Sequence, residues 1–374
     1  MPAFSLDLNK RNKFSLAGNR QLGPLSTLGL WAALCFGGGL YASWQGYGGR
    51  GFAATLTVFS FYFGVMLLFA ARGVEFLSTR FGAGAGYLLG AAAFLAYLIY
   101  DIGTNTFAFS RVGAIAALIF IPLALAASAE REPAGAWQDY LTLAGIWVTV
   151  KFSSHWLWPY PGGRLAYVFT VLLCVNVALA AFLLVRRVPG VGYNIGWGSR
   201  WGFYVVASFL AFGAIAIPLG IGLHFIQFAP QWHAWRSLPF VSLAILFFTA
   251  WPEEFLFRGL LQNILSRSSK SDLAGWWTAS VLFGFSHITN LGFPNWRYVI
   301  LASIAGLFSA GRGTKAIQFS HPLWSMRWLM LPGTFSSGRF EPGSSGSLAP
   351  LCTNAIEKKA PATVRGRYKC RNRL

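Results

Sequence analysis

The chain is poor in charged residues, and in acidic residues above all. Only 11% of its 374 residues are charged, and aspartate and glutamate together number 11. Soluble globular domains carry about 25% charged residues, so this composition excludes a soluble enzyme. Hydrophobic residues instead make up 55% of the chain, and the mean hydropathy is +0.51. Such values are typical of a protein embedded in lipid.

Closely spaced cysteines are also absent. The four cysteines are Cys35, Cys174, Cys352 and Cys370, and the first two lie within apolar segments. No CxxC pair occurs among them. The sequence therefore predicts neither a disulfide framework nor a zinc knot.

Basic residues outnumber acidic ones by 30 to 11, which gives a formal net charge of +19. They fall between and after apolar segments and do not alternate with exposed aromatics in a soluble module. This pattern favours contact with anionic lipid headgroups, and we expect membrane lipid and no nucleic acid as a partner.

Long apolar segments dominate the remaining sequence. Several are long enough to cross a hydrocarbon core of about 30 Å as helices. In lipid the backbone must satisfy its hydrogen bonds internally, which favours helices. We therefore predict an all-α, multi-pass transmembrane protein of the cell membrane. The segments are 27–44, 52–72, 83–100, 105–127, 141–159, 165–185, 202–228, 238–265, 274–291 and 298–308.

The positive charges also predict an orientation, because arginine and lysine concentrate in cytoplasmic loops. With a cytoplasmic N-terminus, the more basic connections all face the cytoplasm, and we expect that orientation. That side then holds Arg72, Arg80, Arg186, Arg187, Arg200, Arg267 and Lys270, and the opposite side holds Arg50, Asp101, Arg164, Arg236 and Arg297.

Two of the few acids, Glu253 and Glu254, are adjacent and directly follow an apolar segment. A charge at such depth costs at least a few kcal/mol unless it is paired or faces a water-filled cavity. In a helix Arg258 lies on the same face as Glu254, whereas Glu253 is turned away by about 100°. We expect Arg258 to keep Glu254 ionised, which leaves Glu253 to accept a proton. In the alternative interpretation a helix begins at Pro252, and the two glutamates lie in its first turn, where they only interact favourably with the helix dipole.

A second candidate group is Phe283-Gly284-Phe285-Ser286-His287, which closes another apolar segment. A neutral imidazole can exchange a proton near pH 7 or bind a metal, and Phe283 lies one helical turn before His287. Taken alone, a histidine at a helix end is more often a structural residue. Both interpretations remain open on this motif by itself.

The EExxxR segment followed by the FxxxH segment is more specific than either motif alone. Over about residues 200–308 the chain resembles the CAAX prenyl protease type 2 and bacteriocin-immunity (Abi, CPBP) family of intramembrane peptidases. The resemblance implies that Glu253, with His287, activates a water that attacks a peptide carbonyl. It implies that Glu254 and Arg258 hold the site. The substrate is then a peptide or a lipidated protein, since eukaryotic relatives remove the last three residues of prenylated proteins.

A divalent metal such as zinc stays open as a cofactor. Members of the family are described both as metal-dependent and as glutamate-dependent peptidases. One glutamate and one histidine are too few ligands for a closed zinc site, and the sequence contains no HExxH motif. Two other classes of function also remain: a non-catalytic immunity or scaffold protein of the same family, and a transporter that uses the two glutamates and His287 as an ion or proton path.

Three regions are expected along the chain. Residues 1–200 form transmembrane helices of unassigned role, and residues 201–308 form the protease-like core. Residues 309–374 contain 11 basic residues and only two acids, with many Ser, Gly and Pro. Such a segment cannot bury enough apolar surface to offset the entropy of ordering it, so we expect a basic, disordered tail.

The family's later motif, a histidine followed four residues on by Asn or Asp, is missing. In the family this histidine helps to bind the oxyanion or the water. His321 lies at about the right distance, but Pro322 follows it and Ser325 is its fourth neighbour. A frameshift near codon 308 is an alternative origin of residues 309–374, because a shifted frame permits His and Asp codons across Ser325-Met326 and Leu329-Met330. A gene whose shifted frame is rich in stop codons would exclude it.

Other marked residues receive plainer interpretations. Lys151, His155 and Arg111 lie within or beside apolar segments and could line a cavity. Isolated charges near helix ends, however, usually snorkel to the interface, and no role is assigned to them. The aromatic residues Trp156, Trp158 and Tyr160, with Trp276 and Trp277, are expected at the membrane interface.

Overall fold

The structure is a computed structural model of the whole chain. The structure describes residues 20–21, 23–44, 46–82, 84–191, 193, 196–197, 201–228, 238–309 and 335–337.

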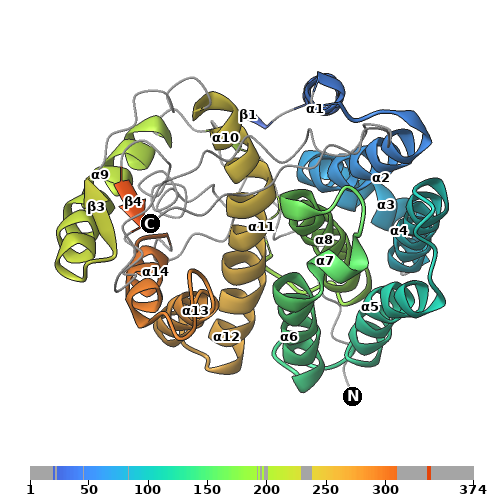
Figure 1. Cartoon of the computed structure of the whole chain (residues 1–374). Coiled ribbons are helices and arrows are strands. Elements are labelled where there is room, and N and C mark those ends of the chain that lie inside the picture. Colours follow the sequence, from blue (N-terminus) through green and yellow to red (C-terminus); the bar gives the residue numbers. More distant parts are fainter. Residues whose placement is uncertain are drawn as a thin grey trace, which may run out of the picture. The chain divides into compact units, whose positions relative to one another are not determined.

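The protein is an all-α, multi-pass membrane protein, as the sequence predicts (Figure 1). Within the described residues, six helical segments are long and apolar enough to cross a membrane: Pro24–Trp44, Gly49–Ala71, Gly84–Gly103, Phe109–Ser128, Leu165–Val185 and Phe240–Ser268. Two shorter apolar helices, Leu210–Gly222 and Trp296–Phe308, accompany them. The prediction of the fold class is therefore confirmed.

The elements follow the apolar segments closely, with short π-helical stretches (η) inside some helices. The first half contains α1 (Pro24–Trp44), α2 (Gly49–Leu68), η2 (Phe69–Gly73), α3 (Val74–Phe81), α4 (Gly84–Gly103), α5 (Phe109–Ser128), α6 (Trp137–Phe152), α7 (Ser154–Leu157), α8 (Gly163–Ala178) and η3 (Leu179–Val185). The second half contains α9 (Trp201–Gly222), α10 (Leu238–Ile245), η5 (Leu246–Ala250), α11 (Trp251–Glu253), η6 (Glu254–Gln262), α12 (Asn263–Ser268), α13 (Asp272–Phe285) and α14 (Trp296–Ser309).

Among the residues that the structure describes, strands form only two very short antiparallel pairs. The strand β1 (Arg20–Gln21) pairs with β2 (Gly196–Trp197), and β3 (Ile226–Phe228) pairs with β4 (Phe335–Ser337). Apart from Ser309 and β4, the predicted tail at 309–374 lies outside the described residues, as do His321, Cys352 and Cys370. The predicted disorder and the frameshift hypothesis therefore stay predictions.

Helix α8 lies at the centre of the N-terminal helices, and α1 lies at their edge (Figure 1). Of the apolar 18-residue stretch within the span Leu165–Val185, 89% is buried inside the protein, whereas 11% of the corresponding stretch of α1 is buried. Large side chains of α1, such as Phe36 and Trp44, are exposed. Their exposure fits a lipid environment, because lipid solvates apolar side chains without cost.

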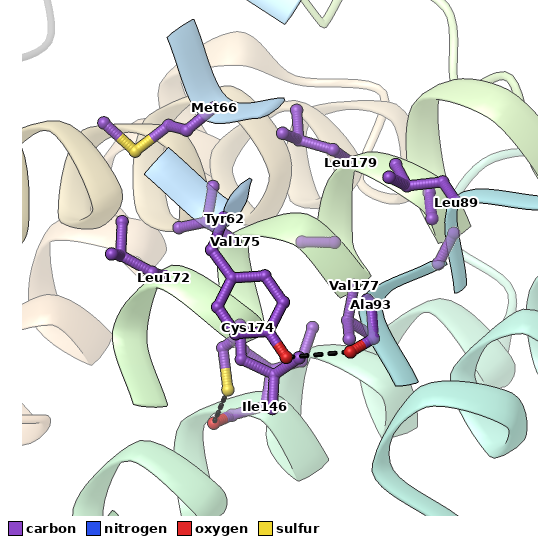
Figure 2. Close-up of a cluster of buried hydrophobic side chains, with 14 of the residues drawn as sticks. Tyr62, Met66, Leu89, Ala93, Ile146, Leu172, Cys174, Val175, Val177 and Leu179 are labelled. Atoms are coloured by element: carbon purple, nitrogen blue, oxygen red, sulfur yellow. Dashed lines mark hydrogen bonds between the residues drawn. The ribbon is translucent and has the colours of Figure 1, made fainter. Parts of the chain in front are cut away.

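Buried polar groups of this bundle form hydrogen bonds between helices, as Figure 2 shows for Tyr62. The Tyr62 hydroxyl on α2 donates to the Ala93 carbonyl on α4 at 2.8 Å. The Asn176 amide on α8 donates to the Tyr62 carbonyl at 3.0 Å. These bonds fasten α2, α4 and α8 together, because a polar group left unpaired in lipid would cost several kcal/mol.

The aromatic residues after α6 do not all lie at the membrane interface, and for Trp158 that expectation is wrong. Its side chain is fully buried, with the rings of Tyr97, Tyr100 and Phe169 at 5.1, 4.7 and 5.0 Å between centroids. The Tyr100 hydroxyl also donates to the Tyr160 carbonyl at 2.6 Å. The reason is that the chain turns back after α7, so aromatic packing with α4 and α8 takes Trp158 into the core.

The charged connections gather as the sequence predicts. Arg186, Arg187 and Arg267 line one pocket at one end of the bundle, together with Glu130 and Glu132. These three arginines were all assigned to the same side of the membrane. Which end faces the cytoplasm stays a prediction.

Candidate active site

Glu253 and Glu254 lie in the middle of one long helix. The elements from α10 to α12 follow one another without a break from Leu238 to Ser268, with helical φ and ψ at Ala250 and Glu254. The alternative interpretation, a helix that begins at Pro252, is therefore wrong. A proline inside an α-helix clashes with the carbonyl four residues earlier. Here that residue is Phe248 in η5, where the wider π-helical turn accommodates the ring.

The two glutamates occupy different environments, as their separation around the helix predicts. Glu253 is half-buried and lines a cavity. Glu254 is only 3% exposed and is not among the residues that line this cavity. Glu254 begins η6, which runs to Gln262 with π-helical hydrogen bonds. Such π-helical stretches occur frequently at functional sites.

Arg258 connects the long helix to the two helices that follow it. Its Nη1 donates to the Ser280 hydroxyl on α13 at 3.3 Å, and its Nη2 donates to the Gly306 carbonyl on α14 at 2.8 Å. The guanidinium also lies 5.7 Å from the centre of the Phe283 ring. A planar fork of donors suits this double attachment. The geometry agrees with the holding role that the family resemblance implies for Arg258.

His287 follows the end of α13 and is 5% exposed. Its Nδ1 lies 2.9 Å from the Phe283 carbonyl and 3.0 Å from the Ser286 hydroxyl. Because a carbonyl can only accept, this contact requires the hydrogen on Nδ1, and the neutral ring then carries its lone pair on Nε2. The imidazole also packs against the rings of Phe283 and Tyr298, with centroids at 4.7 and 4.9 Å.

The segment after His287 is fixed by hydrogen bonds of Asn295. The Asn295 amide nitrogen of the main chain donates to the Ile288 carbonyl at 2.8 Å, and its side chain donates to the Asn290 carbonyl at 2.9 Å. The Asn295 side-chain oxygen accepts from the Tyr298 N–H at 3.1 Å, which caps the start of α14. This loop is therefore held in one conformation beside His287.

Helices α13 and α14 approach each other closely through glycines. A methyl group added at Gly284 would overlap the Ser303 side chain and the Val299 carbonyl of α14. One added at Gly306 would press against Ser280 and the Arg258 guanidinium. Small residues at such contacts let membrane helices pack backbone to backbone. The glycine within the FxxxH motif is thus explained by packing.

A cavity of about 200 Å³ brings Glu253 and His287 together. Its walls come from α6, α8, the long helix and the segment after α13. The lining residues are Trp147, Val150, Lys151, Tyr167, Val171, Thr249, Pro252, Glu253, Leu256, Phe257, Ser286, His287 and Asn290. Of the four predicted site residues, two line the cavity, whereas Glu254 and Arg258 lie outside its lining. A carboxylate and an imidazole in one cavity of this size can together bind and deprotonate a water.

Two polar residues to which the sequence assigns no role also line this cavity, Lys151 and Asn290. The Lys151 ammonium donates to the Asn290 side-chain oxygen at 3.0 Å. Lys151 received no role from the sequence. The one available signal was a lysine inside an apolar segment, which marks a functional candidate when it faces a cavity. The two positions are 139 residues apart in the chain, so the sequence does not indicate their contact.

Helix α6, which carries Lys151, is anchored at its start. Asp139 forms a buried ion pair with Arg186, with 3.0 Å between Oδ1 and Nε. The Tyr140 hydroxyl lies 2.7 Å from the Ser268 hydroxyl at the end of α12. Because residues of α6 and α8 line the cavity, the first 200 residues contribute one of its walls. The sequence assigned no role to this region.

The described residues do not fit a zinc site. They contain no group of three or more His, Cys, Asp and Glu side chains placed to hold a metal ion. A catalytic zinc takes three protein ligands and one water, whereas the cavity offers Glu253 and His287. Glu253 and His287 are thus the side chains of this cavity that could act on a water.

Comparison with known protein families gives a match to part of the chain. No curated protein and no solved structure matches the chain. The matched segment carries both motifs and extends from just before α10 to just after α14. The helices α6 and α8 lie outside it. The resemblance expected from the motifs is thus confirmed over this segment: residues 235–311 match the type II CAAX prenyl endopeptidase Rce1-like family.

Proposed function

We propose that the protein is an intramembrane endopeptidase in which Glu253 and His287 activate a water against a peptide bond. One observation carries this proposal: both side chains line the same cavity within the helical bundle. The family match of residues 235–311 supports the same class of activity. A buried site of this kind suits hydrolysis, because water must reach a bond that lipid otherwise protects.

The proposed chemistry uses each side chain at a stated atom. The Phe283 carbonyl fixes the hydrogen of His287 on Nδ1, so Nε2 can accept a hydrogen bond from the water and orient it. The Glu253 carboxylate takes the proton as the water oxygen attacks the carbonyl carbon. The C–N bond then breaks, and the protonated Glu253 returns this proton to the leaving amine. One water is consumed, and the products are a carboxylic acid and an amine.

The proposed substrate is a peptide or lipidated protein at the membrane. Apolar side chains such as Val171, Leu256 and Phe257 form much of the cavity wall. They would favour an apolar segment next to the scissile bond, because its transfer from water is favourable. The proposal places the protein in the cell membrane with a cytoplasmic N-terminus.

Glu253→Gln tests the proposed function. The change keeps the size of the side chain but removes the base, and general bases contribute about 10²–10⁴-fold to rates. We expect cleavage of a lipidated fluorogenic peptide by purified protein in liposomes to fall by about that factor. Glu75→Gln, an isosteric change at an exposed position of α3, serves as the matched control and should leave the rate unchanged.

The outcome also separates the other classes of function. Equal cleavage by Glu253→Gln and the unaltered protein would exclude the glutamate-dependent peptidase. Ion-coupled uptake into the same liposomes that disappears in the variant would favour the transporter. Absence of both cleavage and ion-coupled uptake in the unaltered protein would favour the non-catalytic scaffold.

A further inference from the structure

Lys151 places a positive charge at the cavity that holds Glu253 and His287. The cavity is otherwise lined mainly by apolar and aromatic side chains. A positive charge in such surroundings interacts strongly with any negative charge that develops nearby, because the local dielectric is low. The motifs for Glu253 and His287 lie within residues 235–311, whereas Lys151 comes from α6, outside that match.

The ammonium is tied to the segment that carries His287. Lys151 donates to the Asn290 side chain at 3.0 Å. The Asn290 N–H donates to the His287 carbonyl at 3.0 Å, and its own carbonyl accepts from Asn295 at 2.9 Å. At its start, α6 is held by the buried pair of Asp139 and Arg186. Helix α6 is thus held at its start by the Asp139–Arg186 pair and near its end by the bond from Lys151 to Asn290.

We propose that Lys151 is the electrophilic residue of the site and stabilises the oxyanion of the tetrahedral intermediate. The inference rests on the proposed peptidase function. When the water oxygen bonds to the carbonyl carbon, the π electrons of the C=O bond move to oxygen, and the proton goes to Glu253. The Lys151 ammonium faces the resulting negative charge and stays protonated throughout. The oxyanion then re-forms the C=O bond as the C–N bond breaks.

The contacts of Lys151 favour this role over recognition of a substrate's terminal carboxylate. In an extended peptide, a carboxylate three residues beyond the scissile carbonyl lies roughly 10 Å away. Lys151 shares one cavity with Glu253 and His287. Its ammonium is bonded to Asn290, whose N–H in turn donates to the His287 carbonyl, which ties the charge to the segment that carries His287.

The test compares Lys151→Met with the unaltered protein in liposomes. Removing one oxyanion donor typically costs about 10²–10³-fold in kcat, and we expect a loss of that size with little change in KM. Lys151→Arg, which retains the charge, should recover part of the rate. Lys270→Met, at an exposed lysine outside the cavity, is the matched control and should leave the rate unchanged.

A binding measurement separates this role from a structural one. The probe is a peptide whose scissile amide is replaced by a phosphonamidate, which carries a fixed negative charge where the oxyanion forms. We expect Lys151→Met to weaken phosphonamidate binding at least tenfold. Binding of the parent peptide, measured in the Glu253→Gln background to prevent turnover, should change less than twofold.

The failures of the two proposals are distinguishable. If Glu253→Gln abolishes cleavage but Lys151→Met changes neither kcat nor phosphonamidate binding, the role of Lys151 is overturned and the peptidase stands. Equal weakening of both ligands by Lys151→Met would also overturn it. If Glu253→Gln retains full cleavage, the proposed function itself fails.

Discussion

At the scale of single residues, the charges around the site divide into those that line the cavity and those that hold helices together. Glu253 and Lys151 line the cavity. Arg258 instead bridges η6 to α13 and α14 through Ser280 and Gly306. A scarce charge at membrane depth is thus informative about function only after its partners are known.

Arg258→Lys tests this division. Lysine presents a compact ammonium in place of the fork that reaches both acceptors, and hydrogen bonds to charged groups contribute about 1.5–3 kcal/mol each. We expect the free energy of unfolding to fall by about 2–3 kcal/mol, measured by denaturant titration in detergent micelles. Arg80→Lys, at an exposed position of α3, should change it by less than 0.5 kcal/mol. Unchanged stability in Arg258→Lys would contradict the bridging role.

At the scale of elements, the site depends on the close approach of α13 and α14. Gly284 sits against Ser303 and the Val299 carbonyl with no space for a side chain. His287 follows directly after α13, so a separation of these helices moves the imidazole. The spacing of two helices is thereby coupled to the geometry of the cavity.

Gly284→Ala is expected to destabilise the protein by about 1–3 kcal/mol, the usual cost of overpacking, and to lower cleavage through displacement of His287. Thermal unfolding and peptide cleavage measure the two effects. A second change, Ser303→Ala, should recover only part of the loss, because the Val299 carbonyl remains in the way. Gly145→Ala on α6 is the control, since a methyl group there meets nothing within 4 Å. Full stability and activity in Gly284→Ala would refute the coupling.

The sequence predicts where these helices lie better than it predicts their breaks and their π-helical stretches. The segment 83–100 corresponds closely to α4 at Gly84–Gly103. The segment 141–159 instead divides into α6 and α7, because the chain turns at Ser153 and buries Trp158. The π-helical stretches were not foreseen either, since apolar periodicity does not distinguish them from the α-helical turns around them.

The candidate site is similarly divided between predicted and unpredicted parts. Glu253 and His287 could be found because each belongs to a local motif. Lys151 and Asn290 could not, because their contact depends on how α6 packs against the segment after α13. Local spacing carries no information about such packing.

At the scale of the whole molecule, charge gathers at one end of the bundle as the sequence predicts. Arg186, Arg187 and Arg267 meet there around one pocket. The end of α12 lies at the same place, because Tyr140 near the start of α6 contacts Ser268. The positive-inside rule assigns this end to the cytoplasm.

Labelling of single cysteines tests the orientation. In a variant in which all four native cysteines are replaced, Lys270→Cys should react with a membrane-impermeant maleimide only after intact cells are permeabilised. Arg50→Cys should react without permeabilisation. Both positions are exposed, so access depends on the side of the membrane. The reverse pattern would invert the predicted topology.

The central claim is that Glu253 and His287 act on one and the same water, and a double-mutant cycle tests it most directly. The measurement is kcat/KM for Glu253→Gln, His287→Gln and the double variant, on one lipidated peptide in liposomes. Residues that act as a unit are strongly non-additive. The account therefore predicts that the double variant is no slower than the slower single variant. Losses that multiply would contradict it, because they would mean that the carboxylate and the imidazole work independently.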